Sequence, residues 1–258
     1  MKQALSPEAD GRPVPPYSAL AAGYDVVMAH VDYEAWAAYA YRLLRKHHAG
    51  FASVVELACG TGSFAIALQQ RGPYRYLATD CSPQMLAIAR EKAVRADVPI
   101  EFAEADVMQF HTEEPFDVLI LLYDSINYLL DEADVRQALD RAYAALRPGG
   151  VLLFDQSTPS NSINNEAYFE DEGGEGAFTY VRQSRYDRET RLHTTQLVLD
   201  VGDERFHEEH VHHAYARETM CALLAQTPFA EEAAYDGMTT APATRATERI
   251  HWIARRPG

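Results

Sequence analysis

One segment constrains the fold of this chain more than any other, because a strand passes through a glycine turn directly into a helix. The strand is predicted over Ser53 to Leu57 and the helix over Ser63 to Gln70, with Gly60 and Gly62 between them. The two glycines permit a tight turn and a close approach of a ligand to the backbone at the end of the strand. The spacing Gly60-x-Gly62-x-x-Ala65 also fits a dinucleotide-binding turn, so by itself it does not select the ligand.

Strand-like and helix-like segments alternate through the rest of the first 160 residues. Further strands are predicted at 74–79, 100–103, 116–122 and 151–155, and further helices at 32–47, 83–96 and 131–146. Such alternation is typical of right-handed βαβ units that build a parallel sheet. The chain is therefore predicted to adopt a doubly wound, Rossmann-like α/β fold.

The pattern changes after Pro159. Three strands, at 178–186, 192–201 and 205–215, are joined by short polar turns and predict an inserted antiparallel β-meander; a helix at 217–226 and strands at 230–236 and 249–254 follow. We therefore divide the chain into an N-terminal arm and helical lid (1–50, of which 1–16 is expected to be loosely docked), a cofactor-binding α/β core (51–160), the inserted antiparallel sheet (175–215) and a C-terminal part that completes the core (216–258).

Charge and cysteine content narrow the functional class. The chain has 38 acidic and 23 basic residues and a net charge of −15, which argues against nucleic acid as its main partner, because a phosphate backbone requires clustered Lys and Arg. Its three cysteines form no CxxC pair, so neither a disulfide framework nor a metal site is expected. The longest apolar run, 118–123, is too short to cross a membrane, and residues 1–16 lack the apolar stretch of a signal peptide. We expect a cytoplasmic protein.

Acidic residues near the glycine turn indicate what kind of ligand it binds. Glu56 lies inside the first strand, where a pyrophosphate gains nothing from a second anion but a ligand with an ammonium and a sulfonium group is favoured. Asp80 ends the next strand, where a carboxylate accepts the hydroxyls of a ribose or simply favours the start of the following helix. Met85, on the first turn of that helix, packs against an adenine or fills the core, and Asp106 accepts the adenine amino group or is a loop residue without a role.

Five motifs in the same order resemble class I S-adenosylmethionine-dependent methyltransferases. They are Glu56-Leu57-Ala58-Cys59-Gly60-Thr61-Gly62, Asp80-x-Ser82-x-x-Met85-Leu86, Ala105-Asp106, Phe116-Asp117 and Leu146-Arg147-Pro148-Gly149-Gly150. The resemblance implies a seven-stranded sheet with a reversed last hairpin, an N-terminal helical lid, and S-adenosylmethionine as cofactor. Ala58 departs from the family, which often has glycine there.

The resemblance also implies roles for individual residues. Glu56 and the turn with Ala58, Gly60 and Gly62 would hold the methionine part, Asp80 the ribose, and Cys81, Met85, Asp106 and Val107 would lie along the ribose and adenine. Aromatic residues of the N-terminal helices often close over the cofactor in this family, and Tyr24 is the leading candidate here, beside Tyr17, Tyr33 and Trp36. An electron-rich ring also stabilises a sulfonium.

Methyl transfer asks little of protein side chains beyond aligning the acceptor and excluding water. An amine acceptor must be neutral when it attacks, and a nearby base takes its proton. Tyr123, Asp124, Asn127 and Tyr128 follow the fourth core strand and are candidates for that base or for positioning the acceptor. This segment resembles glycine/sarcosine-type and aminosugar N-methyltransferases, which implies a small-molecule amine as substrate.

A histidine-rich strand supplies one more candidate. In Glu208 to His213 the alternation of a strand puts Glu208, His210 and His212 on one face, and His210 is predicted to face the substrate. A metal site would need ligands from a third region, which the sequence does not offer.

Two other functional classes stay open at this point. One is a NAD(P)-dependent oxidoreductase on a similar sheet, and the other is a cofactor-binding module without catalysis. A comparison of the affinities for S-adenosylhomocysteine and NADH distinguishes a methyltransferase from the oxidoreductase. Cofactor binding without turnover of any acceptor identifies the binding module.

Overall fold

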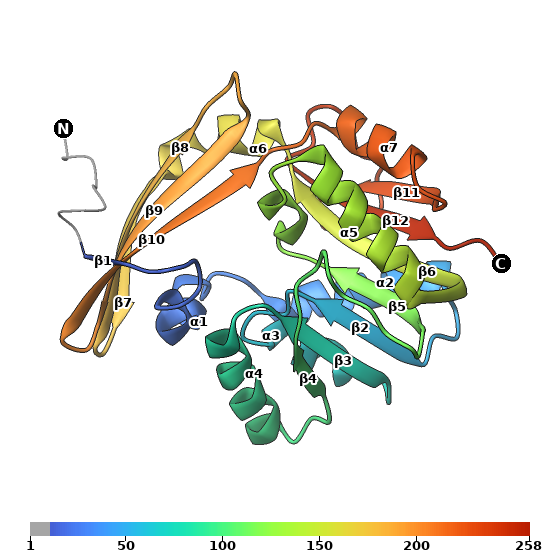
Figure 1. Cartoon of the computed structure of the whole chain (residues 1–258), viewed down its shortest axis with the longest axis horizontal. Helices are drawn as coiled ribbons and strands as arrows, with labels where there is room; N and C mark the ends of the chain where they lie inside the picture. Colours follow the sequence, from blue (N-terminus) through green and yellow to red (C-terminus); the bar gives the residue numbers. More distant parts are fainter. Residues whose placement is uncertain (1–10) are drawn as a thin grey trace.

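The computed structural model describes residues 11–258, which form two sheets (Figure 1). The larger sheet has seven strands in the order β11-β12-β6-β5-β2-β3-β4. Its strands are β2 (Ser53–Leu57), β3 (Arg75–Asp80), β4 (Glu101–Glu104), β5 (Phe116–Leu121), β6 (Leu146–Ser157), β11 (Ala230–Asp236) and β12 (Arg249–Arg255). Strands β2 to β6 are parallel, whereas β12 runs antiparallel to β6 and β11 antiparallel to β12. The predicted seven-stranded sheet with a reversed last hairpin is confirmed.

Helices cover both faces of this sheet, as a doubly wound fold requires. One face carries α2 (Tyr33–His47), α3 (Ser63–Gln69) and α4 (Pro83–Ala96), whose buried side chains pack with those of β2. The other carries α5 (Glu132–Ala145) and α7 (Arg217–Ala225), which pack against β5, β6 and β12. The cap signals in the sequence are realised, since Asp32 accepts from the backbone N–H of Ala35 and Ser82 from that of Met85.

The inserted sheet is larger than the predicted meander. It has five strands in the order β1-β10-β9-β8-β7, namely β1 (Arg12–Pro13), β7 (Glu170–Glu175), β8 (Phe178–Tyr186), β9 (Leu192–Val201) and β10 (Glu204–His213). The three predicted strands are β8, β9 and β10. The sequence Glu170–Glu175 is acidic, contains glycine and is exposed. It therefore lacks the alternating apolar residues from which a strand such as β7 is predicted. Two short helices, α6 (Pro159–Asn164) and η3 (Glu166–Tyr168), connect β6 to β7.

The N-terminal region, predicted as an arm and helical lid, contributes both to the inserted sheet and to the core. Arg12 and Pro13 pair with Phe206 and His207 of β10, so this part of the arm is docked, while residues 1–10 of the predicted arm lie outside the described chain. The chain then passes through η1 (Leu20–Gly23) and α1 (Tyr24–Val27), which pack against the inserted sheet through Leu20 and Phe178. Helix α2 belongs to the core layer. The part that crosses between the two sheets is the segment 15–28, called the N-terminal strap below.

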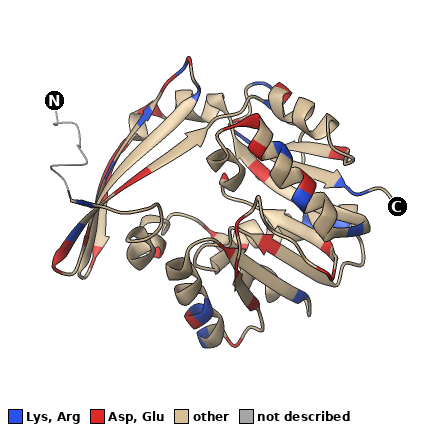
Figure 2. Cartoon of the chain, in the orientation of Figure 1, with Lys and Arg blue, Asp and Glu red and all other residues tan. Residues whose placement is uncertain are grey.

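The surface carries mixed charge. Figure 2 shows basic side chains separated by acidic ones on α4 and α5. Among the described helices, none is both long and apolar enough to pass through a bilayer.

The glycine turn generates a stability prediction. Gly62 has φ +73°, and a Cβ there would lie 3.0 Å from Cβ of Ala89 on α4, whereas Gly176 has φ +60° in open space. Gly62→Ala therefore combines backbone strain with overpacking and should lower the free energy of unfolding by about 2–4 kcal/mol. Gly176→Ala should cost only about 1 kcal/mol, from strain alone. Urea denaturation of both variants checks the difference, and equal losses would mean that the approach of α3 to α4 is not tight.

Candidate functional site

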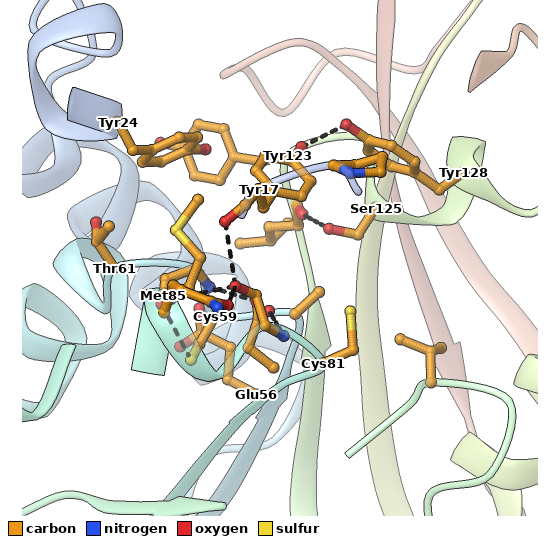
Figure 3. Close-up of a pocket in the computed structure, with 18 of the residues that line it drawn as sticks. Tyr17, Tyr24, Glu56, Cys59, Thr61, Cys81, Met85, Tyr123, Ser125 and Tyr128 are labelled. Carbon is orange, nitrogen blue, oxygen red and sulfur yellow. Dashed lines mark hydrogen bonds between the residues drawn. The ribbon is translucent and has the colours of Figure 1, made fainter. Parts of the chain in front are cut away.

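A cavity of about 620 Å³ opens at the carboxyl ends of β2, β3 and β5 (Figure 3). It is lined by nine of the ten predicted cofactor-binding residues, which are Tyr24, Glu56, Ala58, Gly60, Asp80, Cys81, Met85, Asp106 and Val107. We call it the donor cavity. Ligands of open α/β sheets bind at this edge, where the order of connections reverses.

The tenth residue, Gly62, does not line the cavity. It is the N-cap of α3, and its missing side chain lets α3 approach Ala89. Its role in the turn is therefore conformational. Ala58, in contrast, lines the cavity although it adopts φ +55°, a conformation that favours glycine.

Asp80 braces the glycine turn. Its Oδ2 accepts from the backbone N–H of Gly60 at 2.8 Å, and its Oδ1 accepts from that of Ser82 at 2.8 Å. Burial raises the pKa of Asp80, and these backbone N–H groups oppose the shift. The carboxylate is thus held at the floor of the cavity in one orientation.

The carboxyl group of Glu56 is buried, and its pKa is strongly raised. Burial raises its pKa to about 8, although Tyr76 donates to Oε2 at 2.6 Å and favours the ionised form. The carboxyl is therefore largely neutral at pH 7 in the ligand-free protein. A cationic ligand beside it would favour ionisation.

Aromatic rings form the opposite wall. Tyr17, Tyr24, Tyr33, Tyr123 and Tyr128 line the cavity, and Figure 3 shows four of them above the turn. Tyr123 stacks on Trp36 with ring centroids 4.4 Å apart, and its buried hydroxyl has no hydrogen-bond partner among residues 11–258. Tyr123 and Asp124 are consecutive non-glycine residues with φ near +60°, a costly conformation that the surrounding structure imposes.

Asp124, a candidate for the base or for positioning the acceptor, does not line the donor cavity. It forms an ion pair with Arg249, which also pairs with the buried Asp155. Burial raises the pKa of Asp155 to about 6, and Arg249 opposes that shift. Asn127, a candidate for positioning the acceptor, instead donates to the backbone carbonyls of Ser157 and His213 at 2.9 and 2.7 Å and so joins the two sheets.

Asp124 and Asn127 line a second cavity of about 420 Å³ between the core and the inserted sheet. Leu122, Tyr123, Ser125, Tyr128 and Leu129 line the donor cavity, so the segment 122–129 separates the two. The second cavity is polar, with Arg182, His193 and His212 from the inserted sheet. The Nε2 atom of His212 and the Nε atom of Arg182 are buried without a partner among the described residues.

Glu208 of β10 fastens the N-terminal strap and was not predicted to do so. Its fully buried carboxylate accepts from the backbone N–H groups of Tyr17, Ala19 and Leu20 at 2.8, 2.7 and 2.9 Å. On the core side, Asp25 of the strap accepts from Lys92 and Thr61, each at 2.6 Å. In the sequence, Glu208 is recognisable only as an acid that alternates with histidines on one strand face. That pattern does not indicate which distant segment it contacts.

His210, predicted to face the substrate, lines neither cavity. It is buried behind Tyr128, which contacts it through Oη and Nδ1 at 2.7 Å. Any effect of His210 on a ligand in the donor cavity must therefore pass through Tyr128, to which it is hydrogen-bonded, or through Tyr17, which packs against its ring.

Comparisons with known proteins agree with this geometry. A family model described as a methyltransferase domain matches residues 54–150. A protein from Geobacillus sp. strain WCH70, provisionally named a methyltransferase, is 36% identical over 140 residues, which cover 54% of this chain and 56% of that protein. The match thus spans little more than half of that relative.

Solved structures resemble nearly the whole chain. An S-adenosylmethionine-dependent methyltransferase from Clostridium acetobutylicum ATCC 824 superposes with a TM-score of 0.79 at 22% identity, covering 92% of this chain and 97% of that one. A sugar N-methyltransferase from Streptoalloteichus sp. ATCC 53650 has a TM-score of 0.70 at 23% identity, covering 100% of this chain and 98% of that one. At these identities the likeness concerns the fold, including the inserted sheet.

The Glu208 contacts predict the mobility of the strap. Glu208→Ala removes the acceptor of three buried N–H groups, and hydrogen bonds to a charged group contribute about 1.5–3 kcal/mol each. Amide exchange at Ala19 and Leu20 should accelerate at least about tenfold, measured by hydrogen–deuterium exchange. The matched control is Glu209→Ala, on the exposed opposite face of β10, which should leave these amides unchanged. Unchanged exchange in Glu208→Ala would show that packing alone holds the strap.

Proposed function

We propose that this chain, which belongs to the class I S-adenosylmethionine-dependent methyltransferases, transfers a methyl group to the amine nitrogen of a small molecule. The methyl donor of the family is S-adenosylmethionine. The observation that carries the proposal is the composition of the donor cavity, which combines a buried carboxyl, a braced carboxylate and a wall of tyrosines.

These residues suit S-adenosylmethionine in charge and shape. A Cβ on Gly60 would lie 3.9 Å from a ring carbon of Tyr24, in van der Waals contact, so the bare turn lies close to that ring at the edge of the cavity. Glu56 would hold the ammonium of the methionine part, Asp80 the ribose hydroxyls, and Met85 and Val107 the adenine. The tyrosine wall would face the sulfonium, which electron-rich rings stabilise.

S-adenosylmethionine supplies an electrophilic methyl group on positively charged sulfur, so the protein needs no group that activates the donor. The chain's own residues would exclude water and hold the acceptor in line. The strap covers one side of the donor cavity, and Tyr123 forms the boundary to the second cavity.

The second cavity supports a small-molecule acceptor. Because segment 122–129 lies between it and the donor cavity, the second cavity would hold the part of an acceptor that is away from the reacting amine, and the amine itself would lie in the donor cavity. Asp124 lies at the wall of this cavity, and its ion pair with Arg249 leaves it to bind the acceptor rather than to act as a base. The solved sugar N-methyltransferase has the same fold, which agrees with transfer to nitrogen.

Binding and turnover test the function directly. S-adenosylhomocysteine should raise the melting temperature where NADH does not, and glycine, sarcosine or glucosamine should yield S-adenosylhomocysteine and an N-methylated product by mass spectrometry. Stabilisation by NADH alone would favour an oxidoreductase. Binding of S-adenosylhomocysteine without methylation of any amine would favour a cofactor-binding module.

The ribose assignment predicts the effect of one substitution. Asp80→Asn removes the charge that accepts the ribose hydroxyls and should weaken S-adenosylhomocysteine binding by roughly 1–3 kcal/mol, or about 5- to 150-fold. Isothermal titration calorimetry measures this, and Asp97→Asn at the exposed end of α4 is the control. Wild-type affinity in Asp80→Asn would remove Asp80 from the ribose site.

The raised pKa of Glu56 predicts proton release on binding. Below pH 8 the ligand-free Glu56 carboxyl is mainly protonated, and an ammonium beside it favours the ionised form. S-adenosylhomocysteine should therefore bind more tightly as the pH rises from 6 to 8 and level off above. Calorimetry in buffers of different ionisation enthalpy should detect a released proton at pH 7 that is absent in Glu56→Gln. Equal proton counts in both proteins would place the ammonium elsewhere.

A further inference from the structure

Four hydrogen-bonded side chains lead from the wall of the donor cavity into the inserted sheet. The hydroxyl oxygens of Tyr17 and Tyr128 lie 2.5 Å apart, and both residues line the cavity (Figure 3). Tyr128 Oη is 2.7 Å from Nδ1 of His210, and Nε2 of His210 is 3.0 Å from Oε2 of Glu208. His210 and Glu208 are buried, so the inner end of this chain is away from water.

Glu208 sets the direction of every hydrogen bond in the chain. Its carboxylate already accepts three backbone N–H groups, so His210 Nε2–H is a fourth donor to it. The Nδ1 atom of His210 then keeps its lone pair and accepts the hydroxyl proton of Tyr128. Tyr128 Oη in turn accepts from Tyr17. A lone pair on Tyr17 Oη is thus free to accept a hydrogen bond from an N–H group of a ligand in the donor cavity.

We infer that this chain of side chains removes the proton of the acceptor amine and delivers it to His210. The inference rests on the proposed function. As the nitrogen lone pair forms the new N–C bond, the N–H proton moves to Tyr17 Oη, the phenolic proton of Tyr17 moves to Tyr128, and that of Tyr128 moves to His210 Nδ1. Both tyrosines end neutral, the product is a neutral methylated amine, and the imidazolium of His210 faces the carboxylate of Glu208.

The surroundings of His210 favour this role. Tyr17 of the strap packs edge-on against its ring at 4.8 Å, Tyr128 of η2 (Ser125–Tyr128) contacts it, and Glu208 is the acid on its own strand that pairs with it. His212, the next residue on this face, does not compete for the proton, because burial lowers its pKa to about 4. Its ring contacts that of Tyr128 with centroids 4.0 Å apart and lines the second cavity, so Tyr128 lies where the two cavities meet.

One test reads the hydrogen bonds without turnover. In ¹⁵N-histidine NMR spectra of the ligand-free protein, His210 should show a protonated Nε2 and an Nδ1 that accepts a hydrogen bond. Tyr128→Phe should shift the Nδ1 signal to that of a free imidazole nitrogen. A protonated Nδ1, or a signal that Tyr128→Phe leaves unchanged, would overturn the inference.

A second test reads proton acceptance during catalysis. In His210→Asn the amide oxygen still accepts from Tyr128 but cannot take up a proton, so kcat with the amine that the wild type methylates should fall about 100-fold. The affinity for S-adenosylhomocysteine should stay the same, and kcat should lose its decline at acidic pH. The matched control is His207→Asn, equally buried on the opposite face of β10, which should keep the wild-type profile.

The combined variant distinguishes a relay from separate effects. Tyr128→Phe/His210→Asn should be no slower than His210→Asn alone, because residues that act as a unit are non-additive. Wild-type kcat and pH profile in His210→Asn would overturn the relay while leaving the proposed function standing. A wild type that binds S-adenosylhomocysteine yet methylates no amine would instead overturn the proposed function.

Discussion

The buried carboxylate of Glu208 joins the parts from which the donor cavity is built. A buried charge without partners costs several kcal/mol, and here three backbone N–H groups of the strap and one imidazole compensate it. Because these partners lie on segments far apart in the sequence, satisfying the charge fixes the strap against the inserted sheet. The ends of β2, β3 and β5 would otherwise form an open crevice rather than a covered cavity.

The acidic residues of the site differ in role, since some hold the backbone in its conformation and others are proposed to bind the ligand. Asp80 braces the turn through Gly60 and Ser82, so the group proposed to bind ribose also sets the shape of the backbone beneath it. Glu56 is kept largely neutral by burial until a cation arrives, which avoids two charged carboxylates in one empty cavity. Asp124 and Asp155 share a single cationic partner, Arg249, on the far side of segment 122–129.

Local signals predicted most core elements to within one or two residues. Helix caps and apolar strands depend on residues that are neighbours in sequence, so they can be predicted from it directly. Examples are the N-caps Asp32 and Ser82 and the apolar runs of β2 and β5. The strand β7 was missed because its residues are exposed and acidic, and the packing of α2 in the core layer was not predicted because an amphipathic helix does not reveal which surface it covers. Nine of the ten predicted cofactor-binding residues line the donor cavity, because most of them follow the ends of neighbouring parallel strands, which the topology brings together.

The sequence alone therefore determined the alternating core and the acids at the strand ends, since periodicity, caps and glycine turns act over a few residues, whereas the reversed hairpin was implied by the resemblance to a known family. Only the tertiary structure decided that Asp124 turns away from the donor cavity, that Gly62 serves packing, and that His210 reaches the site through Tyr128. The approach of Gly62 to Ala89 spans 27 positions, and the other two outcomes depend on contacts over more than eighty, between Tyr128 and His210 and between Asp124 and Arg249. Pairings at that distance are set by how two sheets and a strap pack, which no local pattern encodes.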